Sequence, residues 1–190
     1  DLEMSFVEQE DVFNVVENLL VNIFKKFSNK NLLHDQFPKI SYADSMLKYG
    51  SDKPDLRNPL IINDITEIFK RDDVSFEIFK TLVKSGSKVR CISTKNTKDK
   101  PRSFFDNIDK WAKEQGASGL AYFTFEKDRE LSAKGPIGKF FSKEALIEIM
   151  KITNSNVGDS IFMACGKQID LEKITAQARD KIATDLSLID

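Results

Sequence analysis

Lysine and arginine side chains able to contact phosphate are concentrated in the middle of the chain. The stretch KNTKDKPR, residues 95–102, is the most basic, and two more cations lie just before it. Cations at this density suit the phosphate backbone of a nucleic acid. No aromatic residue lies among them, so base stacking is not indicated, and a solvated loop is the alternative. The candidate residues are Lys88, Arg90, Lys95, Lys98, Lys100 and Arg102.

A second basic segment, KGPIGKFF at residues 134–141, places Lys134 and Lys139 beside Gly135 and Gly138. Backbone without a side chain can approach a phosphate closely. The segment lacks the glycine and Lys-Ser/Thr spacing of a nucleotide-binding P-loop, so that motif is excluded. The two lysines join the candidate contacts for RNA, with a tight turn before a helix as the alternative.

Two acids stand at the start of the chain, where Asp1 and Glu3 alternate with apolar residues in DLEMSFV. The alternation predicts a short strand over residues 1–7 with both carboxylates on one face. An edge strand with solvated acids is the alternative. His34 is the only histidine, and Cys91 and Cys165 do not have zinc-ligand spacing, so we expect no metal site.

The segment YGSDKPDLR, residues 49–57, changes the character of the chain. Its glycine, proline and charged side chains cannot form a buried element, so we expect an ordered polar loop. We call it the 49–57 loop; by composition alone it resembles a surface hinge between two domains. Its candidate functional residues are Gly50, Ser51, Asp52, Lys53, Asp55 and Arg57.

The composition indicates a folded protein with no strong overall charge. The chain has 190 residues, 41% of them hydrophobic, and a formal net charge of -1. Any contact with nucleic acid must therefore come from local clusters. No apolar run reaches the ~18 residues of a membrane helix, and two unpaired-looking cysteines suit a reducing cytoplasm. We expect a cytoplasmic protein that does not associate with membranes.

Helices are predicted from apolar periodicity and from capping residues, and strands from alternation. Ser41, Ser142 and Asp170 read as helix N-caps, Ser103 with Asp106 as a capping box, and KSGS at residues 84–87 as a hairpin turn. The predicted helices are 8–27, 42–49, 65–70, 103–115, 143–152 and 171–185, and the predicted strands after residue 58 are 60–62, 74–83, 88–94, 120–125 and 160–164.

This order predicts an α+β fold, with an antiparallel sheet and helices on one face. We expect three parts: a partial catalytic-core segment over residues 1–57, an insertion domain over 58–185, and a return segment over 186–190. The first part has too few elements to fold alone. Because the chain opens on Asp1 in mid-pattern, we expect it to be a piece of a longer protein.

The 49–57 loop, the flanking PKISYADSMLK and NP, and the opening DLEMSFV resemble bacterial-type aspartyl-tRNA synthetases of class II, from the end of motif 2 onward. GASGLAY and KGPIGKFF resemble the GAD insertion domain of that family. Near its end the chain departs from the pattern, because IFMACGKQIDLEKI has Cys165 and Gly166 where an aspartate is common.

This resemblance implies a parent enzyme that ligates aspartate to its tRNA, with ATP and Mg²⁺ as cofactors, as a homodimer. It implies that Asp1 holds the α-amino group of aspartate, with Glu3 in the same pocket, and that the insertion domain contacts tRNA near the acceptor end. We expect this chain to be inactive alone, because the other catalytic motifs are missing from it. The alternatives are a GAD-containing subunit of a tRNA-dependent amidotransferase and a purely structural insert.

Overall fold

The computed structural model describes residues 2–34 and 36–189. The chain divides into two compact units, with the division between Ile40 and Ser41. The predicted boundary lies at 57/58 instead. A division by contacts does not define an evolutionary module, so that boundary stays a prediction.

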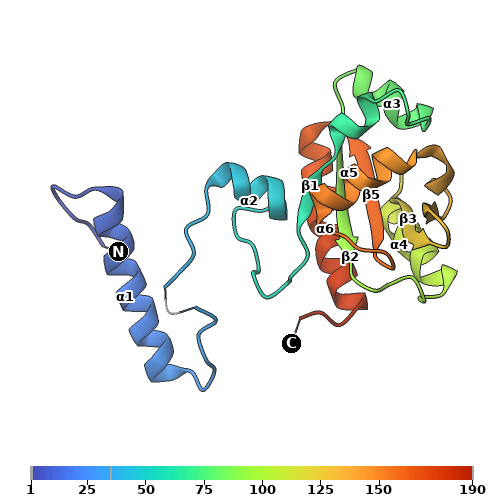
Figure 1. Ribbon diagram of the computed structural model, residues 1–190. Helices are drawn as coiled ribbons and strands as arrows, with labels where there is room; N and C mark the ends of the chain where they lie inside the picture. The colour runs from blue at the N-terminus through green and yellow to red at the C-terminus, as the bar shows by residue number, and fades with distance from the viewer. Residues whose placement is uncertain (1, 35, 190) are drawn as a thin grey trace. The chain divides into compact units, whose positions relative to one another are not determined.

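In the first unit, residues 9–27 form the helix α1 (Gln9–Phe27), which confirms the predicted helix (Figure 1). Glu8 and Asp11 form a reciprocal capping box at its start. Its apolar face is not buried: Leu19, Leu20 and Ile23 are 45–54% exposed. The predicted strand over residues 1–7 is wrong for Leu2–Val7, which form none. Extended alternation fails there because Phe6 has a left-handed backbone with φ 56°.

The second unit is organised on a five-stranded antiparallel sheet with strand order β1-β2-β5-β3-β4. The last strand along the chain, β5, lies at the centre and pairs with both β2 and β3. The strands are β1 (Ile62–Asp64), β2 (Lys88–Thr94), β3 (Ala121–Lys127), β4 (Leu131–Lys134) and β5 (Ser160–Gly166).

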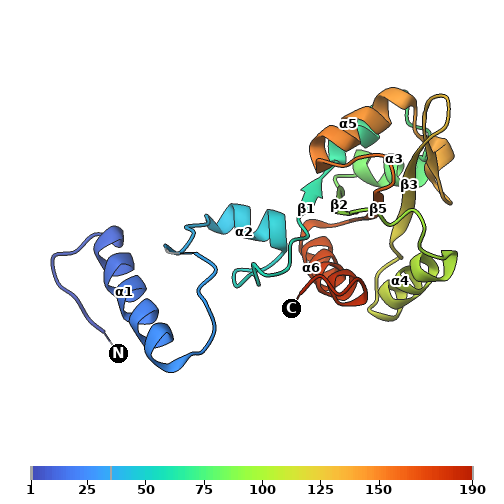
Figure 2. The same cartoon turned by 60° about the horizontal axis from the view of Figure 1, so that its bottom comes forward.

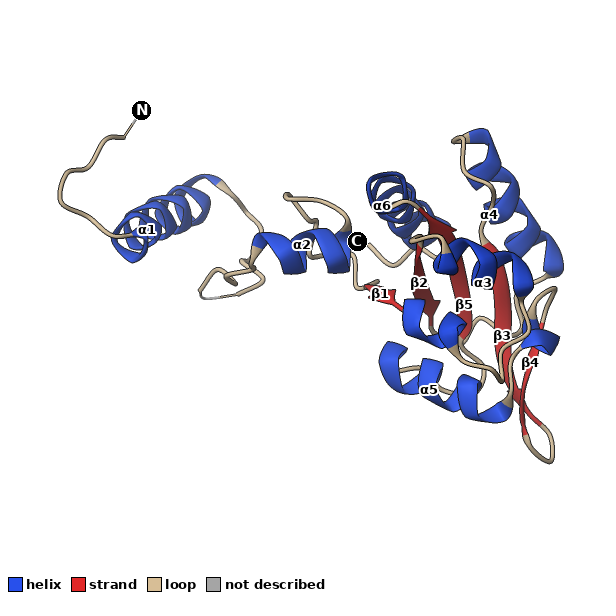
Figure 3. Cartoon of the chain, turned by 90° about the horizontal axis from the view of Figure 1, so that it is seen from above, coloured by secondary structure: helices blue, strands red, loops and turns tan. Residues whose placement is uncertain are grey.

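Helices cover both faces of this sheet (Figures 2 and 3). On one face lie α3 (Glu77–Lys84), α5 (Lys143–Thr153) and the 3-10 helix η1 (Thr66–Lys70), packed on Phe123, Phe125 and Met163. On the other lie α4 (Arg102–Glu114) and α6 (Gln168–Asp185), packed on Tyr122, Phe162 and Ala164. The α+β class with an antiparallel sheet is confirmed, but the helices are not confined to one face. Successive residues of a strand point to opposite faces of the sheet. In β3 and β5 the residues on both faces are apolar, so helices must cover both faces.

Helix α2 (Tyr42–Tyr49) precedes the sheet, and η2 (Gly138–Phe140) follows β4. Two of the predicted caps are confirmed: the hydroxyl of Ser41 accepts from the Asp44 amide, and that of Ser142 from the Ala145 amide. Gly50 ends α2 in the left-handed conformation, φ 68°. In contrast, α4 begins after Pro101 without the predicted Ser103 box, and Asp170 lies inside the first turn of α6.

The predicted strand over residues 74–83 is wrong, because residues 77–84 form α3. Phe76, Phe79 and Val83 pack on the core with helical spacing, whereas Ile78 is 66% exposed. The predicted hairpin turn that follows is therefore the end of a helix, with Gly86 at φ 95°.

Candidate functional site

Four of the eight basic candidates line one cavity of about 540 Å³ in the second unit. Lys98, Lys100 and Arg102 lie at the start of α4 and in the loop before it, and Lys134 lies at the end of β4. Pairing of Thr124 on β3 with Lys134 on β4 brings the distant lysine to this place. We call this cavity the basic groove; its other lining residues are Phe105, Tyr122, Thr124, Glu126, Gly135 and Pro136.

The loop that carries Lys98 is fixed to the turn before β5. The Lys98 amide donates to the Gly158 carbonyl at 3.0 Å. Next to it the buried Asp159 carboxylate, 2% exposed, accepts from the amides of Asn96 (2.9 Å) and Asn156 (2.8 Å) and from Lys95 Nζ (3.0 Å). Asp159 therefore holds the basic loop in one conformation. It was not predicted, since no local pattern marks it.

The cations of the groove are only partly neutralised. Arg102 lies 3.2 Å from Asp106, and Lys134 lies 3.4 Å from Glu126. Among the described residues, Lys98 and Lys100 have no carboxylate within 4 Å, and Lys100 Nζ lies 5.7 Å from the centre of the Phe104 ring. All four cationic side chains lie on exposed residues. The groove therefore presents an excess of positive charge to solvent.

The aromatic side chains under the groove are used in packing. Phe105 and Tyr122 are 5% and 8% exposed and stack on each other with centroids 4.8 Å apart. The Tyr122 hydroxyl donates to Asp106 at 2.9 Å, and burial, with this carboxylate, raises the pKa of Tyr122. Both rings are nearly covered, so the groove suits phosphate better than base stacking.

The other basic candidates lie elsewhere. Arg90 is corrected: it is 5% exposed, lies 3.3 Å from Glu172 and donates to the Met46 carbonyl, so it is a structural residue of the interior. Lys95 is engaged by Asp159 and the Asn154 carbonyl. Lys88 begins β2, and Lys139 lies over the Phe140 ring.

The charges of the 49–57 loop are paired within the loop. Arg57 donates to both carboxylate oxygens of Asp55, at 3.0 and 2.7 Å, and this guanidinium lowers the pKa of Asp55 to about 2. Asp52 lies 3.7 Å from Lys53, whose amide donates to the Ser51 hydroxyl. The functional role of the loop residues stays a prediction.

The predicted substrate pocket at the start of the chain is not assembled by the described residues. Glu3 is exposed, and Asp1 lies outside the described residues. The role of both acids stays a prediction.

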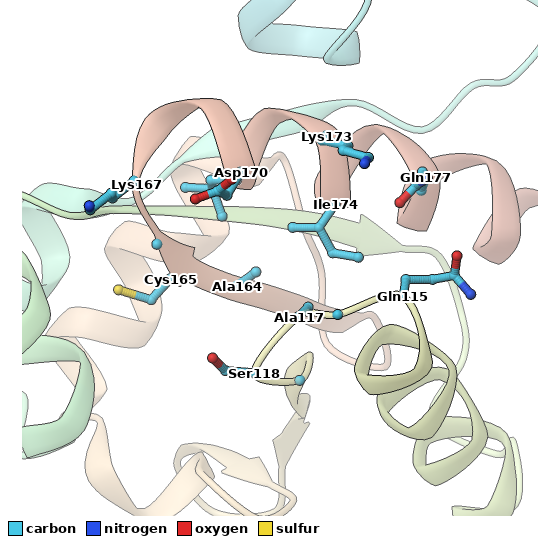
Figure 4. Close-up of a pocket in the computed structure, with 14 residues that line it drawn as sticks. Gln115, Ala117, Ser118, Ala164, Cys165, Lys167, Asp170, Lys173, Ile174 and Gln177 are labelled. Atoms are coloured by element: carbon cyan, nitrogen blue, oxygen red, sulfur yellow. The ribbon is translucent and has the colours of Figure 1, made fainter.

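A smaller cavity, of about 310 Å³, lies between the end of α4 and the start of α6 (Figure 4). Cys165 and Lys167 lie at one end, and Gln115 and Gln177 at the other. Burial raises the pKa of the Cys165 thiol to about 11, so it is not an activated nucleophile. We assign no chemistry to this cavity.

Residues 2–34 and 36–189 bring no three histidine, cysteine, aspartate or glutamate side chains together in a way that fits a metal ion. No helix in that part of the chain combines the length and apolarity required to cross a bilayer.

Comparison with known proteins gives a consistent result. Residues 79–175 match the GAD domain. All 190 residues of the chain align with an aspartate–tRNA(Asp/Asn) ligase of Pelagibacter ubique at 78% identity, and the alignment covers 32% of that protein. Proteins of the same name from Ehrlichia chaffeensis and Methylorubrum populi also align with the whole chain. Their identities are 52% and 46%, and the alignments cover 31% and 32% of those proteins. The chain thus spans about a third of the length of these relatives.

Proposed function

Because this chain belongs to the GAD domain family, we propose that it is part of an aspartate–tRNA ligase and that its basic groove contacts tRNA. The relatives that match the whole chain carry the name of such a ligase. The reaction would activate aspartate with ATP and Mg²⁺ as an adenylate and then transfer it to the terminal ribose of tRNA. Residues 2–34 and 36–189 bring no three side chains together that could hold a metal ion. We therefore assign no step of activation to them, and place that chemistry in other parts of the parent enzyme.

The observation that carries the RNA proposal is the convergence of Lys98, Lys100, Arg102 and Lys134 on one cavity. Ammonium and guanidinium groups bind phosphate without reading sequence. Because Phe105 and Tyr122 are buried beneath them, we propose that the groove contacts the backbone of the duplex near the acceptor end. Binding of this kind positions an RNA and does not select among bases.

The relatives' names include both aspartate and asparagine tRNA. We propose that the parent of this chain likewise accepts both. A groove that contacts only backbone would serve both tRNAs equally, so discrimination, where it exists, would lie outside this domain.

The test uses the complete gene product that contains this chain, assayed for tRNA binding and aminoacylation over a range of salt. The groove variant is K98A/K100A/R102A/K134A. The matched control, K84A/K110A/K143A/K151A, removes the same charge from exposed lysines that do not line the groove. The full domain fold of each variant is checked by circular dichroism.

Each lost phosphate contact lowers the slope of log K against log salt by about 0.9 for duplex nucleic acid. We expect the groove variant to lower this slope by about 2 to 4 and to weaken tRNA binding. The control variant should leave tRNA affinity nearly unchanged and should change the slope by less than the value for one contact, about 0.9. If the two variants behave equally, the proposal that the basic groove contacts tRNA is wrong, and a purely structural insert is favoured. A gene product that charges no tRNA with aspartate would contradict the ligase.

A further inference from the structure

The 49–57 loop is bound to α6 through the buried side chain of Arg179, which is 2% exposed. Its Nε donates to the Leu60 carbonyl at 2.6 Å. One terminal nitrogen, Nη2, donates to the carbonyls of Asp55 (2.9 Å) and Asn58 (2.7 Å). The guanidinium thus binds the loop and the residues just after it from a position more than a hundred residues later in the chain.

Two further contacts join the loop to the same helix. An added Cβ on Gly50 would come within 2.7 Å of both the Ala176 Cβ and the Glu172 carbonyl oxygen, so the backbone lies directly against α6. The Asn58 side chain donates to the Arg179 carbonyl and to Asp180, both at 3.2 Å. The loop therefore packs along about two turns of α6.

Arg179 binds the loop through the geometry of its guanidinium group and not through pairing with a carboxylate. Its desolvation lowers its pKa, and its nearest carboxylate, Asp180, is 3.6 Å away and 69% exposed. The ring of Tyr49, the first residue of the loop, lies 5.0 Å from the guanidinium carbon. A planar fork reaches three carbonyls at once, whereas a lysine ammonium at the same place cannot match that arrangement.

We propose that Arg179 is a positioning residue that makes the 49–57 loop and the sheet unit one rigid body. The loop is then not a hinge. The basic groove and the loop keep a fixed relation, so the loop determines where the groove meets RNA. The last statement rests on the proposed function; the rigid connection does not.

The first test is hydrogen exchange of the chain, comparing R179M and R179K with the wild type. Arg129, exposed in the turn between β3 and β4, provides the control variant R129M. We expect the amides of Asn58 and Leu60, which are bonded within this region, to exchange at least about tenfold faster in R179M. The amides of β5 should change less, and R179K should lie between R179M and the wild type. Unchanged loop amides, or equal acceleration throughout the unit, would overturn the proposal.

The second test measures kinetics of the complete gene product. We expect R179M to raise KM for tRNA by about fivefold or more, with little change in aspartate-dependent ATP–pyrophosphate exchange. Equal losses in both assays would mean general destabilisation, and no change in KM would mean that the loop does not position the groove. If the wild type does not charge tRNA, the ligase proposal fails, while hydrogen exchange still decides the rigid connection.

Discussion

Replacing Asp159 with asparagine removes one acceptor oxygen from the most heavily used carboxylate of the basic loop. Asp159 is 2% exposed and accepts three side-chain hydrogen bonds, from the Asn96 amide, the Asn156 amide and Lys95 Nζ. The asparagine oxygen can keep the two donors that share one carboxylate oxygen. Its nitrogen must then face the Asn96 amide, so two donors point at each other.

The magnitude follows from these contacts. A buried amide left without an acceptor costs about 1–3 kcal/mol. The bond from Lys95 loses its charge assistance, and because that lysine side chain is 52% exposed we count this as about 0.5–1 kcal/mol. We therefore expect D159N to reduce the free energy of unfolding of the second unit by about 1.5–4 kcal/mol.

The assay is urea unfolding followed by the fluorescence of Trp111, the only tryptophan, which lies in α4 of this unit. With an m value of about 2 kcal/mol/M, the midpoint should fall by about 1–2 M. The control is D128N at an exposed turn position, expected within about 0.5 kcal/mol of the wild type. If D159N unfolds like this control, our account of how the basic loop is held is wrong.

Two other substitutions test the region around the 49–57 loop. G50A should destabilise the fold by about 2–4 kcal/mol, because residue 50 has a left-handed backbone and the added methyl group would overlap Ala176. G86A also changes a residue with positive φ, but the space around it is open, so it should cost only about 1 kcal/mol. Equal urea midpoints for the two variants would contradict the close contact between Gly50 and α6. For Asp55, with a pKa of about 2 when folded against an ordinary 3.8, stabilisation by Arg57 is complete above about pH 4 and is lost as pH falls towards 2. D55N should therefore flatten the pH dependence of stability in that window, and an unchanged acid titration would contradict the pairing.

Features fixed by neighbouring residues could be predicted from the sequence. Ser41 and Ser142 were identified as caps because a hydroxyl at that position satisfies an amide three residues later. Strand β2 was located by alternation and β5 by its apolar run, and each ends within two residues of its predicted limit. The three basic residues of the groove that are near one another, Lys98, Lys100 and Arg102, were found by local charge density.

What failed depends on contacts between distant parts of the chain. In the sequence, Arg90 cannot be distinguished from the exposed basic residues Lys88 and Lys95. Its burial becomes clear only from its pairing with Glu172, which lies 82 residues later in the chain. Arg179 gave no local signal, because its acceptors precede it by 119–124 residues. Residues 77–84 were misassigned because Phe76, Ile78 and Leu82 also fit alternation, and only the packing of Phe79 and Val83 on the core decides for a helix.

The central place of β5 has a consequence for synthesis on the ribosome. Before residue 160 is made, β1 with β2 and β3 with β4 can pair only as separate two-stranded ribbons, each with an edge awaiting β5. At about 5–20 residues per second, β2 waits several seconds for its main partner. During this interval the nascent chain exposes unpaired edges beside phenylalanine-rich surfaces, which are the features that chaperones bind and that lead to aggregation. Truncations that end before β5 should therefore accumulate as insoluble or chaperone-bound chains, and extension through α6 should release them.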